Sequence, residues 1–287
     1  MIKKRISAAL ALIRWDKPYG TLLLLAPALW SLVIASKGAP PVYLVGIFTI
    51  GAFLMRSAGC AINDFADHPF DGLVERTQNR PLPSGRITPI EALLIFLILS
   101  FSAFVLIWWL NPLTRILSVI ALALAAIYPF TKRFFHAPQL FMGIAFGWGT
   151  VMAWAAVRDS LEWTTAYIFL ATVFWATAYD TIYALMDHRE DRRAGIHSSA
   201  LLFGDHSWIA VGAMFGVSVV FLVLSGKGTG LGTAYYLSVA VAAACFLYQS
   251  IILRTARDRV RLFSLFKSHA GIGLIILAGI WIGYRIP

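Results

Sequence analysis

Charged residues are scarce in this chain. Asp, Glu, Lys and Arg together make up 13% of its 287 residues, whereas 59% of the residues are hydrophobic. Because soluble domains carry about 25% charged residues, this composition excludes an ordinary soluble protein. Acidic residues are the scarcer kind, with 14 Asp and Glu against 24 Lys and Arg. A cluster of carboxylates in such a chain is therefore a candidate functional site.

Cysteine is also nearly absent. Cys60 and Cys245 lie in apolar segments that are distant in sequence, and their spacing matches neither a metal-binding nor a redox motif. We interpret both as small packing residues. No linker or low-complexity tract divides the chain, which predicts a single domain over residues 1–287.

What the chain does contain is a series of long apolar runs. Several reach the roughly 18–20 residues that a helix needs to cross a bilayer. The predicted segments are about 18–36, 43–62, 90–110, 113–131, 139–157, 163–184, 208–226, 231–252 and 269–285. The predicted fold class is an all-α integral membrane protein, a bundle of nine transmembrane helices around a central cavity.

The basic residues alternate between the two ends of these segments. One set of termini and loops holds 18 Lys and Arg, and the other set holds five. The richer set is 1–17, 63–89, 131–138, 186–207 and 253–268. The positive-inside rule places that set, and with it the N-terminus, in the cytoplasm. Because topology explains the basic excess, we expect membrane lipid around the protein and no nucleic-acid partner.

A first group of polar residues follows the second apolar segment, in the run Asn63-Asp64-Phe65-Ala66-Asp67-His68-Pro69-Phe70-Asp71. Asn63 and Asp67 are four residues apart, so they share one face of a helix. Pro69 predicts that this helix ends nearby, with Asp71 at the mouth of the following loop.

A second group follows the sixth segment. Asp180, Tyr183, Asp187 and Asp191 are spaced by three, four and four residues, which keeps them on one helical face. A lone buried carboxylate such as Asp180 requires a metal, a cation or a hydrogen-bond donor as a partner. Two such groups on facing helices can hold divalent cations through oxygen ligands, which suits the binding and ionisation of a diphosphate.

Arg56 is an ionisable residue inside an apolar segment and is therefore a functional candidate. It precedes Asn63 by seven residues, which places it about 10 Å deeper on nearly the same face. Either it pairs with a neighbouring carboxylate such as Asp180, or it recognises a carboxylate on a substrate inside the bundle. We favour the second interpretation.

Further basic residues lie beside the first acidic group. Arg76, Arg80 and Arg86 follow it in the sequence, where cations neutralise diphosphate oxygens. Each of them individually also fits a membrane-surface arginine. Lys132, four residues after Tyr128, fits a phosphate contact and a topological role equally well.

The two acidic stretches resemble the signatures of a known family. Arg56-Ser57-Ala58-Gly59-Cys60-Ala61-Ile62-Asn63-Asp64-x-x-Asp67-x-x-x-Asp71, continuing through Val74-Glu75-Arg76-Thr77 and Arg80-Pro81-Leu82, resembles the first motif of the UbiA superfamily of intramembrane aromatic prenyltransferases. Tyr179-Asp180-Thr181-Ile182-Tyr183-Ala184-x-x-Asp187-x-x-x-Asp191, continuing to Gly204, resembles the second. Within that superfamily the motifs are most similar to those of 4-hydroxybenzoate polyprenyltransferases.

The resemblance implies roles for particular residues. The implied Mg²⁺ ligands are Asn63, Asp67, Asp71, Asp187 and Asp191. The implied catalytic carboxylates are Asp64, Asp67, Asp71, Asp180, Asp187 and Asp191, of which Asp64 or Asp180 polarises the phenol or accepts a proton. The implied substrate-binding residues are Arg56, Arg76, Arg80, Tyr128, Lys132 and Tyr183, with Arg56 on the aromatic acid.

The implied reaction transfers a polyprenyl group from polyprenyl diphosphate to 4-hydroxybenzoate in prenylquinone synthesis, ubiquinone or plastoquinone. The implied location is the bacterial cytoplasmic (inner) membrane. Two alternatives stay open: a related enzyme with another aromatic acceptor, and a secondary transporter that uses paired intramembrane acids to bind ions. The acids gather at one membrane surface rather than at the midplane, which favours the enzyme.

Overall fold

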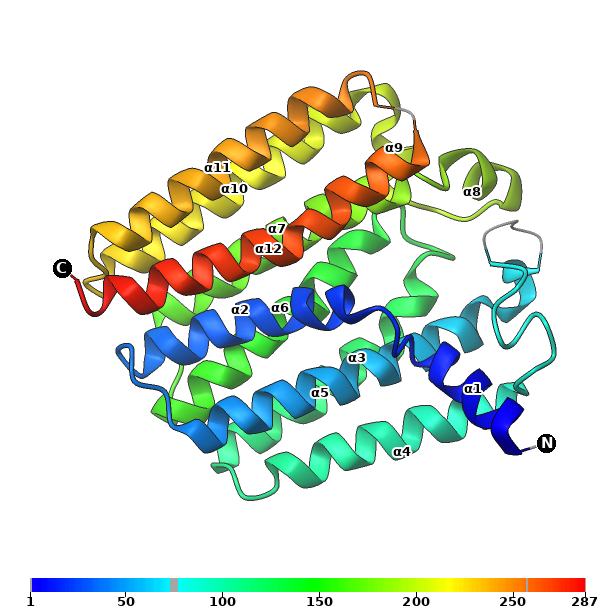
Figure 1. Cartoon of the computed structure of the whole chain (residues 1–287), viewed down its shortest axis with the longest axis horizontal. Coiled ribbons are helices and arrows are strands. Elements are labelled where there is room, and N and C mark those ends of the chain that lie inside the picture. Colours follow the sequence, from blue (N-terminus) through cyan, green and yellow to red (C-terminus); the bar gives the residue numbers. More distant parts are fainter. Residues whose placement is uncertain (1, 73–76, 257, 287) are drawn as a thin grey trace.

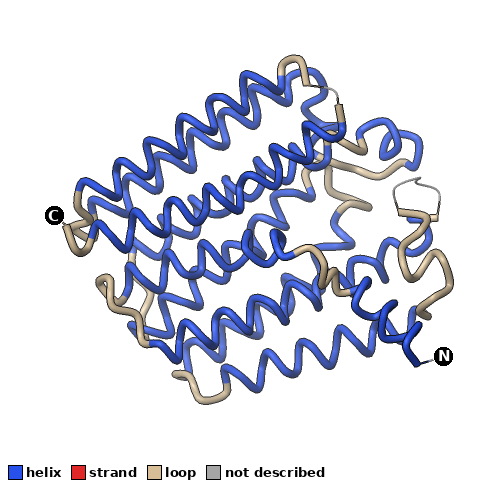
Figure 2. The backbone as a smooth tube through the Cα atoms, in the orientation of Figure 1, coloured by secondary structure: helices blue, strands red, loops and turns tan. Residues whose placement is uncertain are grey.

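The computed structural model describes residues 2–72, 77–256 and 258–286, and the regular elements in these ranges are all helices (Figures 1 and 2). Long helices lie side by side, and the short helices α1, α8 and α9 gather toward one end (Figure 1). The α-helices are α1 (Ile2–Leu12), α2 (Pro18–Ala35), α3 (Val42–Asp71), α4 (Pro89–Ile107), α5 (Pro112–Thr131), α6 (Pro138–Arg158), α7 (Trp163–Ala184), α8 (His188–Ala194), α9 (Ser199–Phe203), α10 (Ser207–Lys227), α11 (Thr233–Leu253) and α12 (Arg259–Gly283).

Proline marks the start of several long helices. It suits this position because the first helical N–H has no partner within the helix and because the fixed φ of proline is already helical. The helices that begin this way are α2, α4, α5 and α6. Helix α4 adds a capping box, in which Thr88 accepts from the Glu91 amide and Glu91 accepts from the Thr88 amide.

Eight helical segments among the described residues are long and apolar enough to cross a membrane, so the chain is a multi-pass membrane protein. They match the predicted segments except for 163–184. That segment forms the 22-residue helix α7, whose threonine, tyrosine and tryptophan content makes it too polar for the same criterion. Helix α7 is largely buried between α6 and α10. A helix that faces other helices rather than lipid can carry polar side chains, and the count of nine spans stays a prediction.

Three threonine hydroxyls of α7 are satisfied within the helix. Thr172, Thr177 and Thr181 donate to the carbonyls of Ile168, Val173 and Thr177, four residues earlier, at 2.7–2.8 Å. These bonds remove the cost of burying the hydroxyl groups.

A buried polar network ties α7 to α11 and α12. The indole of Trp175 donates to Nδ1 of His269 at 2.9 Å, and Nε2 of His269 lies 2.8 Å from Oε1 of Gln249. Because Nδ1 accepts, the proton is on Nε2, and the imidazole is neutral. His269 is fully buried, and stacked aromatic rings of Phe215 and Phe246 flank it.

The prediction that the second long helix ends near Pro69, with Asp71 at the mouth of the following loop, is confirmed to within two residues. Helix α3 passes through Pro69 and ends at Asp71. A proline this close to the end costs one backbone hydrogen bond only, and Thr77 Oγ1 donates to the Asp71 carbonyl at 2.7 Å, which satisfies one terminal acceptor. Asn63, Asp67 and Asp71 therefore stand at intervals of four on one helical face.

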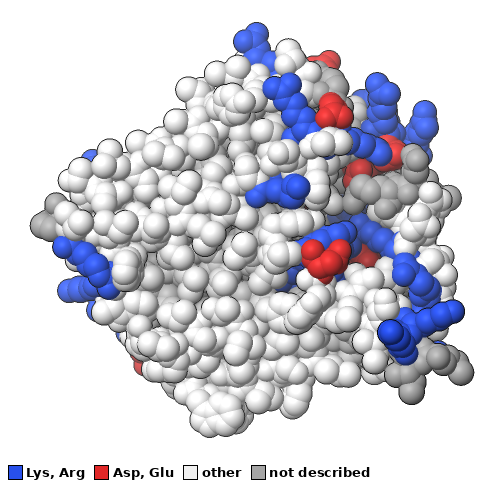
Figure 3. Space-filling view, viewed as in Figure 1, with Lys and Arg blue, Asp and Glu red and all other residues white. Residues whose placement is uncertain are grey.

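The predicted last segment, 269–285, begins ten residues later than the helix in the structure. Helix α12 starts at Arg259, with Asp258 as its N-cap accepting from the Arg261 amide at 2.9 Å. Residues 259–268 of the basic stretch are thus helical. Charged side chains gather at the end of the molecule that holds α1 and α8, with a smaller basic group at the opposite end and an uncharged band between them (Figure 3).

Candidate active site

A cavity of about 1560 Å³ joins the two acidic groups. Its wall combines residues of the helices α2 to α7 with the start of α12. The predicted site residues that line it are Arg56, Asn63, Asp64, Asp67, Asp71, Arg80, Tyr128, Lys132, Asp180, Tyr183, Asp187 and Asp191. Arg86 lines it as well, whereas Arg76 lies outside the described residues. The structure thus brings together groups that are more than a hundred residues apart in sequence.

The first acidic group forms a stripe along the last turns of α3. Asn63 Nδ2 donates to Asp67 Oδ2 at 3.0 Å, one turn further along the helix. The ammonium of Lys132, just after α5, lies 2.5 Å from the Asp67 carboxylate. Both Asp67 and Asp71 are largely buried, so the cation offsets part of the cost of removing the carboxylates from water.

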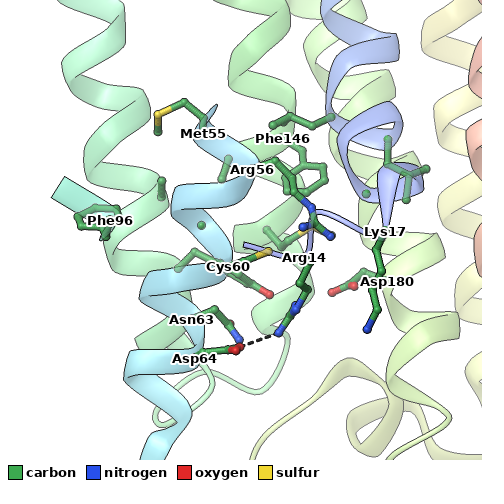
Figure 4. Close-up of a pocket in the computed structure, with 18 of the residues that line it drawn as sticks. Arg14, Lys17, Met55, Arg56, Cys60, Asn63, Asp64, Phe96, Phe146 and Asp180 are labelled. Carbon is green, nitrogen blue, oxygen red and sulfur yellow. Dashed lines mark hydrogen bonds and ion pairs between the residues drawn. The ribbon is translucent and has the colours of Figure 1, made fainter. Parts of the chain in front are cut away.

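Arginine side chains connect the remaining carboxylates of this stripe. Arg80 Nη1 lies 2.8 Å from Asp71 Oδ2 and 3.2 Å from Asp64 Oδ1. Arg14, from the segment before α2, donates to the same Asp64 oxygen at 2.6 Å (Figure 4). Burial raises the pKa of Asp71, which lies beyond the membrane-spanning part of α3; Arg80 opposes the rise, and Asp67 and Asp64 add to it.

The second acidic group lies where α7 passes into α8. Asp187 is the residue before α8 and Asp191 lies in its first turn; both line the cavity. Arg259, the first residue of α12, braces this turn, because its Nε donates to the Met186 carbonyl at 2.9 Å and its Nη2 lies 2.5 Å from Glu190. The carbonyl of Met186, two residues after the end of α7, is thereby satisfied by a side chain from another helix.

The donor set suits a hard cation. Among the described residues, no three His, Cys, Asp or Glu side chains already stand close enough together to hold a metal ion. Mg²⁺, however, keeps several waters and is usually held by one or two carboxylates together with substrate phosphates. The carboxamide and carboxylates at the cavity mouth, on α3 and at the start of α8, are oxygen donors of this kind, so their chemistry fits Mg²⁺.

Deeper in the cavity, Arg56 and Asp180 do not pair with each other. Arg56 Nη1 donates to the Ile13 carbonyl at 3.1 Å, and its guanidinium lies against Gly20, where a β-carbon would come within 2.6 Å of Nη2. Asp180 reaches the cavity from α7, across from Asp64 on α3 (Figure 4). Within the described part of the chain, no hydrogen bond or ion pair reaches the Asp180 carboxylate. The alternative in which these two residues neutralise each other is therefore wrong.

Much of the rest of the wall is apolar and reaches the outside of the bundle. Phe96 and Phe146 line it, as do Leu97, Phe101 and Phe104 of α4. The side chains of Leu97 and Phe101 are also 52% and 68% exposed, so they border both the cavity and the outer surface. A long apolar ligand can pass here from the cavity into lipid.

Two residues of this site escaped the sequence analysis. Arg14 stands next to a tryptophan at the start of an apolar segment, so it fits an interfacial anchor equally well. Arg259 lies in a basic stretch that also fits a lipid-facing loop. Only their contacts with Asp64 and Glu190 in the folded protein distinguish these arginines from residues at the membrane surface.

Comparison with known proteins agrees with this geometry. The family model described as the UbiA prenyltransferase family matches residues 24–270. The chain belongs to this family.

Curated relatives match over nearly their whole length. The 4-hydroxybenzoate octaprenyltransferase of Vibrio vulnificus (strain CMCP6) is 44% identical over 284 residues, which cover 99% of this chain and 100% of the relative. The protein of the same name from Aeromonas hydrophila is 45% identical over 284 residues, covering 99% of each chain.

Solved structures share the fold. An apo UbiA homolog from Aeropyrum pernix K1 superposes with a TM-score of 0.80 and 26% identity, covering 91% of this chain and 97% of that one. A UbiA homolog from Archaeoglobus fulgidus bound to GPP and Mg²⁺ has a TM-score of 0.67 at 14% identity, covering 97% and 100% of the two chains. At 14% identity, the Archaeoglobus fulgidus structure shows only that the two chains share a fold.

Proposed function

We propose that this UbiA-family chain transfers a polyprenyl group from a polyprenyl diphosphate to the carbon ortho to the hydroxyl of 4-hydroxybenzoate, releasing diphosphate, in ubiquinone or plastoquinone synthesis. The observation that carries the proposal is one cavity with carboxylates and cations at its mouth and apolar walls beyond. The name shared by the full-length relatives supports this acceptor and an octaprenyl donor.

The mouth of the cavity binds the diphosphate in this proposal. Asn63, Asp67, Asp71, Asp187 and Asp191 would hold Mg²⁺, which neutralises diphosphate charge so that the group can leave. Lys132 and Arg80 already stand beside these carboxylates, at 2.5 and 2.8 Å from Asp67 and Asp71. They supply fixed positive charge where the leaving group gains negative charge.

The inner part of the cavity binds the acceptor. Arg56 recognises its carboxylate, since a guanidinium matches a carboxylate with two parallel hydrogen bonds. The C–O bond to diphosphate breaks to leave an allylic cation, and the ring carbon then forms a C–C bond to its allylic carbon. Asp180 takes the proton that this ring carbon loses, because Asp64 is already paired with two arginines whereas Asp180 is not.

The apolar wall serves two purposes. Phe96, Phe146 and the aliphatic side chains of α4 exclude water, which would otherwise quench the allylic cation. The exposed edge at Leu97 and Phe101 gives the long prenyl tail a path into lipid.

The membrane placement belongs to the same proposal. The chain forms one UbiA-like domain over residues 1–287, with α7 as the ninth span and the N-terminus in the cytoplasm. The basic end of the molecule faces the cytoplasm in accordance with the positive-inside rule, in the inner membrane of a bacterium.

Purified protein in lipid nanodiscs tests the reaction. It is incubated with Mg²⁺, prenyl diphosphates of several lengths, and 4-hydroxybenzoate or a competing naphthoate or homogentisate. Prenylated 4-hydroxybenzoate is the expected major product. Preferred prenylation of another ring would assign a different acceptor, and no product with any ring would reject the function.

A further inference from the structure

Arg14 stands out because its backbone is strained. Its φ is +54°, in the left-handed region that residues other than glycine rarely adopt. The Arg14 amide donates to the Ala11 carbonyl and the Trp15 amide to the Leu10 carbonyl, at 3.2 and 3.1 Å. This pair of bonds is the Schellman ending of α1, and Arg14 holds the position where glycine is usual. An arginine here costs backbone energy that glycine would avoid.

The side chain of Arg14 points into the cavity rather than to solvent. It lines the cavity and is 23% exposed, and its Nη2 lies 2.6 Å from Asp64 Oδ1 (Figure 4). Asp64 is 1% exposed and accepts from Arg80 as well. A single buried carboxylate thus holds two guanidinium groups, and one cation would be enough to neutralise it.

The position of Arg14 favours an anionic ligand. Its neighbour Ile13 accepts from Arg56, and its partner Asp64 is shared with Arg80, so Arg14 lies between the proposed acceptor-binding and diphosphate-binding arginines. A guanidinium has five N–H donors, and the Asp64 pair uses one nitrogen. The remaining donors are available to substrate oxygens.

We infer that Arg14 is a further substrate-binding residue, which contacts an anionic oxygen group of a substrate, and that Asp64 holds its guanidinium in place. The oxygen group is the diphosphate of the donor or the carboxylate of the acceptor. This inference rests on the proposed function, because both ligands are substrates of that reaction.

Arg14→Gly separates binding from folding. Glycine relieves the strained φ, and Arg80 still pairs with Asp64, so the variant is expected to fold. The Michaelis constant for one substrate should rise roughly 10- to 100-fold, as expected when a charge-assisted hydrogen bond is lost, while the midpoint of thermal unfolding stays close to that of the wild type. A higher KM for polyprenyl diphosphate, with weaker inhibition by inorganic diphosphate, assigns the diphosphate. A higher KM for 4-hydroxybenzoate assigns the carboxylate.

Lys37→Gly is the matched control. Lys37 also has a left-handed φ, of +51°, and ends α2 with the same two bonds: Lys37 N to Ile34 O and Gly38 N to Val33 O. It is exposed and does not line the cavity, so glycine there should leave both KM values unchanged.

Two further variants keep the test decisive. Arg14→Lys retains the charge without the planar fork and should lie between the wild type and Arg14→Gly, which covers the case in which the glycine variant does not fold. If Arg14 only neutralises Asp64, the double variant Arg14→Gly/Asp64→Asn would restore both KM values, and the inference would be overturned. Unchanged KM values in Arg14→Gly would overturn it too. A wild-type protein without prenyl transfer would instead reject the proposed function.

Discussion

The ammonium of Lys132 and the carboxylate of Asp67 lie 2.5 Å apart and join the end of α5 to the acidic stripe of α3. The pair places a positive charge at the cavity mouth before any substrate arrives. Lys132→Gln removes this charge, and we expect the KM for polyprenyl diphosphate to rise roughly 10- to 100-fold, as for the loss of a charge-assisted hydrogen bond.

Initial-rate measurements at saturating 4-hydroxybenzoate check this expectation. Lys227→Gln is the control, because Lys227 is an exposed residue at the end of α10 that does not line the cavity. Equal KM values in both variants would assign Lys132 to topology alone.

Asp187→Ala should abolish prenyl transfer without affecting insertion into the membrane. The change removes a proposed Mg²⁺ ligand at the turn between α7 and α8, where Arg259 contacts Met186 and Glu190. Product formation and the yield of folded protein from membranes are measured together. Asp159→Asn is the matched control, since Asp159 is an exposed C-cap in a left-handed conformation that asparagine tolerates. Full activity of the Asp187→Ala variant would show that Asp187 is not needed for prenyl transfer.

Removing divalent cations should have the same effect in the wild type. EDTA is expected to stop prenyl transfer, and added Mg²⁺ to restore it, because carboxylates and a diphosphate cannot share one site without a cation between them. Undiminished turnover in excess EDTA would contradict the proposed metal ligands.

Gly20→Ala tests Arg56 without changing its charge. The new methyl group would lie 2.6 Å from Arg56 Nη2, so the flexible guanidinium must move away from its present position. We expect a higher KM for 4-hydroxybenzoate, about 10-fold for the loss of one well-aligned contact, and an unchanged KM for polyprenyl diphosphate. Gly46→Ala on α3, which meets nothing within 4 Å, is the control. A rise in the donor KM instead would place Arg56 at the diphosphate.

His269→Leu should lower stability and spare the chemistry. The substitution leaves the Trp175 indole and the Gln249 side-chain carbonyl without their buried partner, at a cost of about 1–3 kcal/mol for each unsatisfied group. The thermal midpoint in detergent should fall, with KM values unchanged in the folded fraction. His206→Leu, at an exposed position, is expected to leave the midpoint unchanged.

The long helices and most of the charged residues that line the cavity could be predicted from the sequence because both depend on local pattern. Apolar runs and N-terminal prolines define the helices, and intervals of four residues bring Asn63 and Asp67 to one face. The partner of the last carbonyl of α3 was not predicted, because Thr77 lies six residues further along the chain. Nothing local reveals such a partner.

The arginines of the cavity also show that a local pattern identifies some site residues and misses others. Arg56 was identified because it interrupts an apolar run, which is a local signal. Arg14 and Arg259 lie in basic stretches, where one more cation gives no signal in the sequence. Their place in the site is evident only from their contacts with Asp64 and Glu190, which are 50 and 69 residues away. Roles that depend on distant partners require the structure.

The polarity of α7 has a consequence for how the protein is made. A helix with this many hydroxyl-bearing side chains partitions poorly into lipid on its own, yet in the finished bundle it is enclosed, chiefly by α6 before it and α10 after it. During synthesis α7 would therefore be retained at the translocon, or would enter the membrane together with α6, until α10 has been synthesised and packs against its other side. A nascent chain that stops between α7 and α10 should leave Asp180 and its helix poorly anchored and open to quality-control proteolysis.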